Sequence, residues 1–151
     1  MANENQYKTT TKYIATRGVK EYRKAALEWI KPSDKVLEIG CEWGTSSALL
    51  FGHCHTYIAT DISSECIERA KQKYPKINFA VLDVFNINAA LDFKIPFNKI
   101  LIDVSGFSGY RSLLDVLALL NTYASVFEPE AIIIKSGALK QLARNCVAWR
   151  K

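Results

Sequence analysis

Short apolar segments alternate with amphipathic ones along most of the chain. Five segments are mostly apolar or β-branched and are bounded by turn residues, which indicates buried strands. Between them, apolar side chains recur every three or four positions, which indicates helices. The predicted strands cover residues 35–39, 56–60, 78–82, 99–103 and 131–135, and the predicted helices cover residues 19–30, 45–51, 63–74, 86–91, 110–127 and 139–149.

This alternation predicts a doubly wound α/β fold. Apolar strands need cover on both faces, and right-handed crossover connections place helices over each face. We therefore expect a Rossmann-like parallel sheet of about five strands with helices on both sides. The 151 residues, 49% of them hydrophobic, suit a single domain over residues 1–151. Residues 1–15 begin with a polar, threonine-rich stretch and are predicted to form a flexible arm.

The predicted strands end in polar residues, at the edge where such a sheet binds ligands. Gly40 and Gly44 flank a loop after the first strand, where Gly40 permits a tight turn and Gly44 lets the backbone approach a ligand as a helix begins. Asp61 ends the second strand, about 20 residues further on, where a carboxylate can accept hydrogen bonds from a ribose diol. Asp83 and Asp103 end the next two. Alternatively, the glycines only permit tight helix packing, and Asp61 only caps a helix.

Together these strand ends resemble the class I S-adenosylmethionine-dependent methyltransferases over residues 35–135. The resemblance implies S-adenosylmethionine as cofactor, S-adenosylhomocysteine as product, and a methyl acceptor that the residues do not identify. The family usually adds an antiparallel hairpin after the fifth strand, which we do not expect here. The cofactor-binding residues that the resemblance implies are Glu38, Gly40, Glu42, Gly44, Asp61, Ile62, Asp83, Val84 and Asp103.

The resemblance also implies a role for each strand end. The loop with Glu38, Gly40 and Gly44 would surround the methionine moiety, and Asp61 would hold the ribose hydroxyls. Asp83 would contact the adenine amino group. Asp103 would face the methyl group and the acceptor.

Glu42 departs from the family's loop, which usually has glycine at that place. We therefore expect the backbone at Glu42 to take another conformation or to bend away from the ligand. The Gly-x-Gly-x-x-Gly loop of nicotinamide-binding domains is absent. A pyrophosphate would meet the Glu42 carboxylate, whereas a cationic sulfonium would not be repelled. A redox nucleotide-binding domain is thus the weaker alternative.

Asp103 and Lys135 are the candidate catalytic residues. A lysine and an aspartate at the ends of these two strands resemble part of the catalytic set of RNA ribose 2′-O-methyltransferases. Such a lysine can stabilise a developing alkoxide or take the acceptor's proton, while Asp103 orients it. Alternatively, Lys135 only extends to solvent from a strand end. Metal-dependent catechol-type O-methyltransferases need further carboxylate or amide ligands after the fifth strand. Lys135 stands there in this chain, so we expect no metal.

Charge and cysteine content leave the partner open. The formal net charge of +5 suits an anionic acceptor such as RNA, but it also suits solubility alone, and a small-molecule acceptor fits equally. Four scattered cysteines without a signal peptide predict reduced thiols and a cytoplasmic location, and no apolar run is long enough for a membrane span. Five strands would leave one sheet edge open, which a homodimer or the amino-terminal arm could cover. A catalytically inactive cofactor-binding module is the alternative function.

Overall fold

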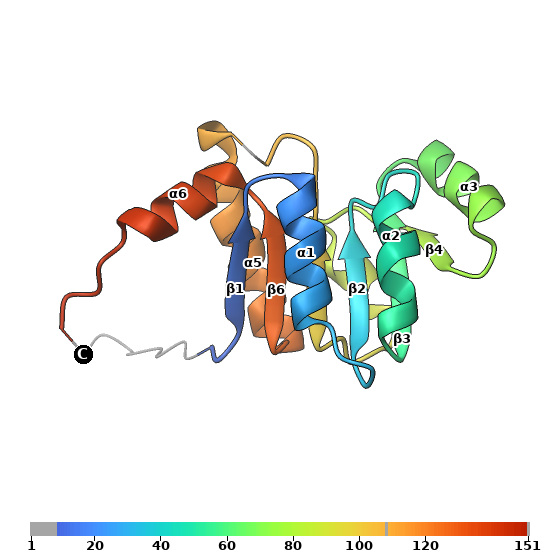
Figure 1. The fold of residues 1–151 in the computed structure, drawn as a ribbon, viewed down its shortest axis with the longest axis horizontal. Helices are drawn as coiled ribbons and strands as arrows, with labels where there is room; N and C mark the ends of the chain where they lie inside the picture. Colours follow the sequence, from blue (N-terminus) through green and yellow to red (C-terminus); the bar gives the residue numbers. More distant parts are fainter. Residues whose placement is uncertain (1–8, 108, 151) are drawn as a thin grey trace.

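Six strands form one parallel sheet in the computed structural model, which describes residues 9–107 and 109–150. Their order across the sheet is β1-β6-β5-β2-β3-β4, and each neighbouring pair is parallel (Figure 1). The predicted Rossmann-like α/β class is confirmed, with six strands instead of about five. The strands are β1 (Lys12–Thr16), β2 (Lys35–Ile39), β3 (Thr56–Asp61), β4 (Asn78–Val81), β5 (Lys99–Ile102) and β6 (Ala131–Lys135).

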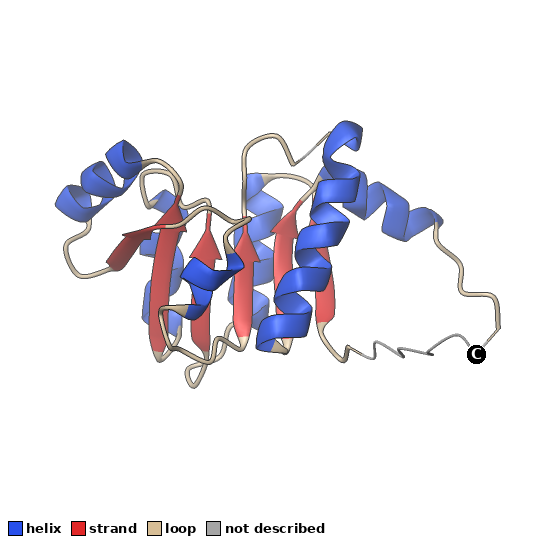
Figure 2. Ribbon diagram, turned by 180° about the vertical axis from the view of Figure 1, so that it is seen from behind, coloured by secondary structure: helices blue, strands red, loops and turns tan. Residues whose placement is uncertain are grey.

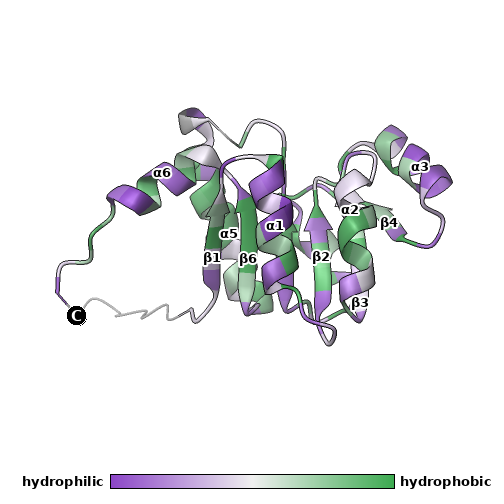
Figure 3. Cartoon of the chain, viewed as in Figure 1, coloured by the Kyte–Doolittle hydropathy of each residue, from purple (hydrophilic) through white to green (hydrophobic). Residues whose placement is uncertain are grey.

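Helices cover both faces of the sheet (Figure 2). The described helices are α1 (Val19–Trp29), α2 (Thr45–Leu50), α3 (Ser64–Lys73), α4 (Ile87–Leu91), α5 (Leu113–Phe127) and α6 (Gly137–Asn145), with short 3-10 turns at Phe51–His53 and Tyr110–Ser112. One core cluster includes residues of α1, α2 and α3, and the other includes residues of α4, α5 and α6. Leu101 of β5 faces the first cluster and its neighbours Ile100 and Ile102 face the second. The hydropathy of the residues in Figure 3 agrees with this burial, because β6 is hydrophobic and much of the outer face of α1 is hydrophilic.

The amino-terminal part differs from the prediction. Residues 12–15, predicted to belong to a flexible arm, lie in β1, which pairs in parallel with β6 from Lys12↔Ala131 to Thr16↔Lys135. That part of the prediction was wrong because Thr16 alone is fully buried in this short edge strand, so the sequence shows no apolar alternation. Residues 1–8 lie outside the described residues. The chain's own amino-terminal segment thus covers the edge of β6.

The last helix is shorter than predicted. It ends at Asn145, whereas we expected it to continue to residue 149. Every residue from Gln141 to Arg150 is exposed, so this stretch lacks the packing that holds most helices in place. Among the described residues, no helix has both the length and the apolar character needed to cross a membrane.

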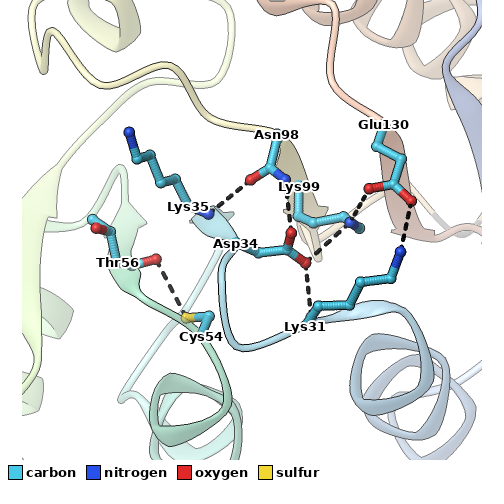
Figure 4. Close-up of polar contacts among 8 residues, drawn as sticks. All are labelled: Lys31, Asp34, Lys35, Cys54, Thr56, Asn98, Lys99 and Glu130. Carbon is cyan, nitrogen blue, oxygen red and sulfur yellow. Dashed lines mark hydrogen bonds and ion pairs between the residues drawn. The ribbon is translucent and has the colours of Figure 1, made fainter.

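A buried charge cluster joins the amino ends of the central strands (Figure 4). Lys99, the first residue of β5, has no exposed side-chain surface, and its Nζ lies 3.0 Å from Asp34 and 2.7 Å from Glu130. Asp34 also accepts hydrogen bonds from the Lys31 backbone N–H and the Asn98 side chain, both at 2.7 Å. This cluster fixes the end of the sheet opposite to the strand ends that carry the candidate site.

Candidate functional site

A pocket of about 560 Å³ lies at the carboxyl ends of the strands. Eight of the ten residues predicted for the site line this pocket. They are the last residues of β3 and β6 or come from the segments directly after β2, β3, β4 and β5, which are far apart in sequence and meet at this edge of the sheet. The eight are Gly40, Glu42, Asp61, Ile62, Asp83, Val84, Asp103 and Lys135.

Gly40 lies where the loop after β2 passes closest to the end of β5. Its φ is +87°, and a Cβ there would lie 2.0 Å from the backbone oxygen of Asp103. The N–H groups of Gly40 and Cys41 both donate to the Thr60 carbonyl, at 2.8 and 2.9 Å. The tight turn that we predicted for this glycine thus brings it against the protein's own backbone.

Glu42 takes the left-handed conformation that glycine favours, with φ of 50°. The first part of our expectation, a conformation other than the one that glycine favours, was wrong, whereas a bend of the backbone away from a ligand stays a prediction. The reason is a hydrogen bond, because the Glu42 N–H donates to Oδ2 of Asp61 at 3.0 Å and fixes the loop against β3. The loop thus keeps a glycine-like path while adding a carboxylate to the pocket lining.

Asp61 supports the loops on either side of it. Its Oδ1 accepts the Ser63 N–H at 2.9 Å, and its Oδ2 accepts the Glu42 N–H. The cap of α3 is Ser63, whose hydroxyl accepts the Cys66 N–H at 3.2 Å, so the alternative that Asp61 is only the helix cap was wrong. Each carboxylate oxygen has a second lone pair, and Asp61 therefore keeps acceptor capacity toward the pocket.

Negative charge dominates the pocket. Its described lining residues include four carboxylates, those of Glu42, Asp61, Asp83 and Asp103, and one amine, that of Lys135. The Lys135 amine forms an ion pair with Asp103, and the two side chains are 25% and 16% exposed. Lys135 therefore does not simply extend into solvent. Three carboxylates remain without a cationic partner in the lining, which favours a positively charged ligand.

The family follows from a comparison with known sequences. The model of the methyltransferase domain family matches residues 36–126, which is more than half of the chain. The chain belongs to this family. The predicted resemblance to class I S-adenosylmethionine-dependent methyltransferases is thereby confirmed. No curated protein matches the chain.

Solved structures share the fold of this methyltransferase domain. DesVI from Streptomyces venezuelae is 14% identical with a TM-score of 0.58, and the match covers 76% of this chain and 50% of DesVI. The sugar N-methyltransferase KedS8 from Streptoalloteichus is 16% identical with a TM-score of 0.50, and the match covers 69% of this chain and 39% of KedS8. The chain thus spans half or less of these two proteins. At such identities the similarity concerns the fold alone.

Two residues predicted to bind the cofactor lie behind the pocket wall of the methyltransferase domain. Gly44 precedes α2 with φ of +78°, and a Cβ there would lie 2.8 Å from the ring of Phe79. Glu38 is 1% exposed, and its Oε2 accepts hydrogen bonds from the hydroxyls of Ser47 and Tyr57, the latter at 2.9 Å. Their contact with a cofactor stays a prediction, and the structure gives both a packing role.

Sequence reasoning missed one prominent residue of the lining, Phe85. Its side chain is 59% exposed, and its ring meets that of Phe107 edge to face, with 6.2 Å between the centroids. Its N–H donates to Oδ1 of Asp83 at 2.9 Å, so the turn that orients Asp83 also presents the ring. The available signal was its position two residues after Asp83, at a strand end.

Burial makes Glu38 a pH-sensitive element of the methyltransferase domain. Burial, and to a smaller extent the charge of Asp103, raise the pKa of Glu38 from 4.5 to about 7, against the opposing hydrogen bonds from Ser47 and Tyr57. Between these two values the folded state holds a proton that the unfolded state has lost. Stability therefore falls as the pH rises through this range, by about 3 kcal/mol in total.

A Glu38→Gln variant is expected to lose this pH dependence, because the amide keeps the shape of the side chain and does not ionise. Urea unfolding of both proteins at about pH 5 and about pH 8 measures it. The variant should gain stability relative to the natural protein at the higher pH. An equal change with pH in both proteins would show that Glu38 is ionised throughout.

Proposed function

We propose that this domain binds S-adenosylmethionine in the acidic pocket and transfers its methyl group to an acceptor held beside Asp103 and Lys135. The main support for the proposal is that four carboxylates line one pocket of a chain that belongs to the methyltransferase domain family. The cofactor supplies an electrophilic methyl group on a positively charged sulfur. Its sulfonium and ammonium groups suit the negative pocket.

The rest of the pocket also fits this cofactor. Its volume of about 560 Å³ lies within the usual range of ligand pockets. Asp61 would accept hydrogen bonds from the ribose hydroxyls. Leu82 and Val84 line the pocket on either side of Asp83, and Ile62 follows Asp61, so apolar and acceptor groups are available for an adenine ring. Glu42 and Asp103 would face the cationic groups.

The Asp103 and Lys135 pair would act on the acceptor. The Lys135 amine can donate a hydrogen bond to an acceptor hydroxyl oxygen and stabilise the negative charge that develops there as the hydroxyl proton passes to water. Asp103 holds the amine by the ion pair and fixes its position at the pocket. Both side chains are partly buried, so water screens the pair less than it would at an open surface.

The charge of the pocket favours a small neutral or cationic acceptor over RNA. Phosphates would meet three carboxylates without cationic partners in the lining. Two basic side chains, one from α1 and one from α6, are already engaged, since Arg23 donates to Ser46 at 2.9 Å and Lys140 pairs with Glu21. We expect fluorescence anisotropy to detect no salt-sensitive binding of labelled single-stranded RNA. Binding that weakens steeply with added salt would restore RNA as the acceptor.

The Asp61→Ala variant is expected to bind S-adenosylmethionine about 10- to 150-fold more weakly, because it loses a charged hydrogen-bond acceptor worth about 1.5–3 kcal/mol. Isothermal titration calorimetry of the variant and the natural protein measures this. Asp92→Ala is the matched control, because Asp92 is exposed and does not line the pocket. Equal affinity in the Asp61→Ala variant would remove the ribose contact from the proposal.

A catalytically inactive module is the second candidate. The observation that favours it is that Glu42 adds a carboxylate to the pocket lining where the family's loop usually has glycine. Incubation of the protein with methyl-labelled S-adenosylmethionine and pools of metabolites, proteins or RNA separates the two functions. Transfer of label that Lys135→Met abolishes would support the enzyme, and cofactor binding without transfer to any pool would support the module.

A further inference from the structure

The outer side of β1 is a surface that the proposed function does not use. β1 pairs with β6, and within residues 9–107 and 109–150 no strand pairs with its other side. Beside it lies a groove of about 490 Å³ between β1, α5 and α6. An unpaired strand edge next to an apolar groove is a surface that commonly takes a partner. The apolar lining of the groove includes Ala15, Leu117, Leu120, Leu139 and Ala143.

The end of α6 and the segment after it extend past this edge (Figures 1 and 2). We call residues 141–150 the overhang, all of which are exposed. Its apolar side chains Leu142, Val147 and Trp149 are 37%, 90% and 84% exposed, and Arg150 lies over one face of the Trp149 ring. An amphipathic helix gains most of its stability by burying its apolar side. Of the overhang, only Ala143 lines the groove of its own molecule. Leu142, Val147 and Trp149 therefore offer apolar surface that the described residues leave exposed.

We propose that a second copy of this chain docks on the outer edge of β1, so that the overhang of each copy covers the groove of the other. The overhang and the groove lie next to each other on one molecule. A twofold axis beside β1 would therefore place the overhang of each copy against the groove of the other. Such an isologous contact uses the same patch on both copies and closes after two. A dimer of this kind buries both surfaces of both copies.

The sequence of β1 suits antiparallel pairing with itself. Centred on Ile14, the pairing sets Ile14 opposite its own copy, Tyr13 opposite Ala15, and Lys12 opposite Thr16. In this register no two like charges face each other. Like charges directly opposite would destabilise the pairing, and two identical strands can easily place them so. Tyr13, Ile14 and Thr16 also belong to the aromatic and β-branched residues that favour strands.

The backbone hydrogen bonds of β1 show which substitution would affect only its outer edge. The Lys12 N–H donates to the Glu130 carbonyl at 3.0 Å, on the β6 side, and the Thr16 carbonyl accepts on that same side from Ser136 at 2.9 Å. Because successive N–H groups of a strand point to opposite sides, the Ala15 N–H points to the outer edge. Proline at position 15 would remove an outward donor and leave the pairing with β6 in place.

The mass of the full chain in solution tests the proposal. Light scattering over a wide range of concentration should give twice the monomer mass of 17.0 kDa for the natural protein. Ala15→Pro, and separately Leu142→Glu combined with Trp149→Ser, should give the monomer mass. The second variant changes only exposed residues, so it decides the matter if Ala15→Pro fails to fold. Leu49→Glu, on exposed surface of α2, is the matched control and should stay dimeric.

Two results would overturn the proposal. One is a monomer mass for the natural protein at every concentration, which would assign the groove to a different protein or to another segment of this chain. The other is a dimer that neither variant dissociates, which would place the contact on another surface. Calorimetry with S-adenosylmethionine on the same variants should give unchanged affinity, so the dimer and the cofactor site are tested independently.

Discussion

Replacing Gly40 with alanine is expected to destabilise the protein by roughly 2–5 kcal/mol, a large fraction of a typical domain's stability. The added Cβ would lie 2.0 Å from the Asp103 carbonyl oxygen, and the backbone would keep a φ of +87°. Both atoms of the clash belong to backbone or Cβ, so no rotamer change relieves it. Urea unfolding followed by circular dichroism measures the loss.

Alanine substitutions at two other glycines separate the cost of the positive φ from the cost of the steric clash. Gly106 also has a positive φ, of +89°, but a Cβ there meets nothing within 4 Å, so Gly106→Ala should cost only the conformational part, about 1–2 kcal/mol. Gly52 has neither constraint, and Gly52→Ala should leave stability nearly unchanged. If Gly40→Ala cost no more than Gly106→Ala, the close contact between the ends of β2 and β5 would not exist.

Replacing Lys99 with methionine is expected to cost about 3–5 kcal/mol, because it leaves the buried Asp34 carboxylate without its cation. Asp34 is 2% exposed, whereas Glu130 is 46% exposed and can turn to water. Methionine has a similar length, so the loss would come from charge rather than from a cavity. Urea unfolding of Lys99→Met, of Asp34→Asn and of the double variant forms a double-mutant cycle.

The double variant and the pH dependence identify the cause. Removing both charges should recover much of the loss, since a neutral pair carries no unpaired buried ion. Burial raises the pKa of Asp34, but hydrogen bonds from Lys31, Lys99 and Asn98 outweigh it and hold this pKa below the usual value. Without Lys99 the carboxyl protonates more readily, so the deficit should shrink as the pH falls. A deficit independent of pH would point to packing instead of charge.

Sequence patterns predicted the central part of the fold well because their cause is local. The central strands β5 and β6 are buried on both faces, so nearly every residue in them is apolar. The ends of β2 to β6 all fall within a residue of the predicted positions. The edge strand β1 lacked this signal, since its place depends on pairing with β6, more than a hundred residues away. The end of α6 was overpredicted for a related reason, because its apolar residues find no surface to pack on.

The candidate site was predictable to a similar degree. Carboxylates at the ends of parallel strands meet at one edge of the sheet, so Asp61, Asp83 and Asp103 could be grouped from the sequence. Burial within the wall could not be predicted, which is why the packing role of Glu38 was not foreseen. Lys99 shows the same limit, since a lysine at the start of an apolar strand gives no sign of its two distant carboxylate partners.

Calorimetric titration of the natural protein with S-adenosylmethionine tests the central claim most directly, with S-adenosylhomocysteine and a nicotinamide dinucleotide titrated in parallel. We predict one site per chain, with a dissociation constant on the order of micromolar for S-adenosylmethionine. The nicotinamide dinucleotide should not bind, because its pyrophosphate would enter a pocket lined by Glu42, Asp61, Asp83 and Asp103. Tight binding of the dinucleotide, or no binding of either S-adenosyl compound, would contradict the account.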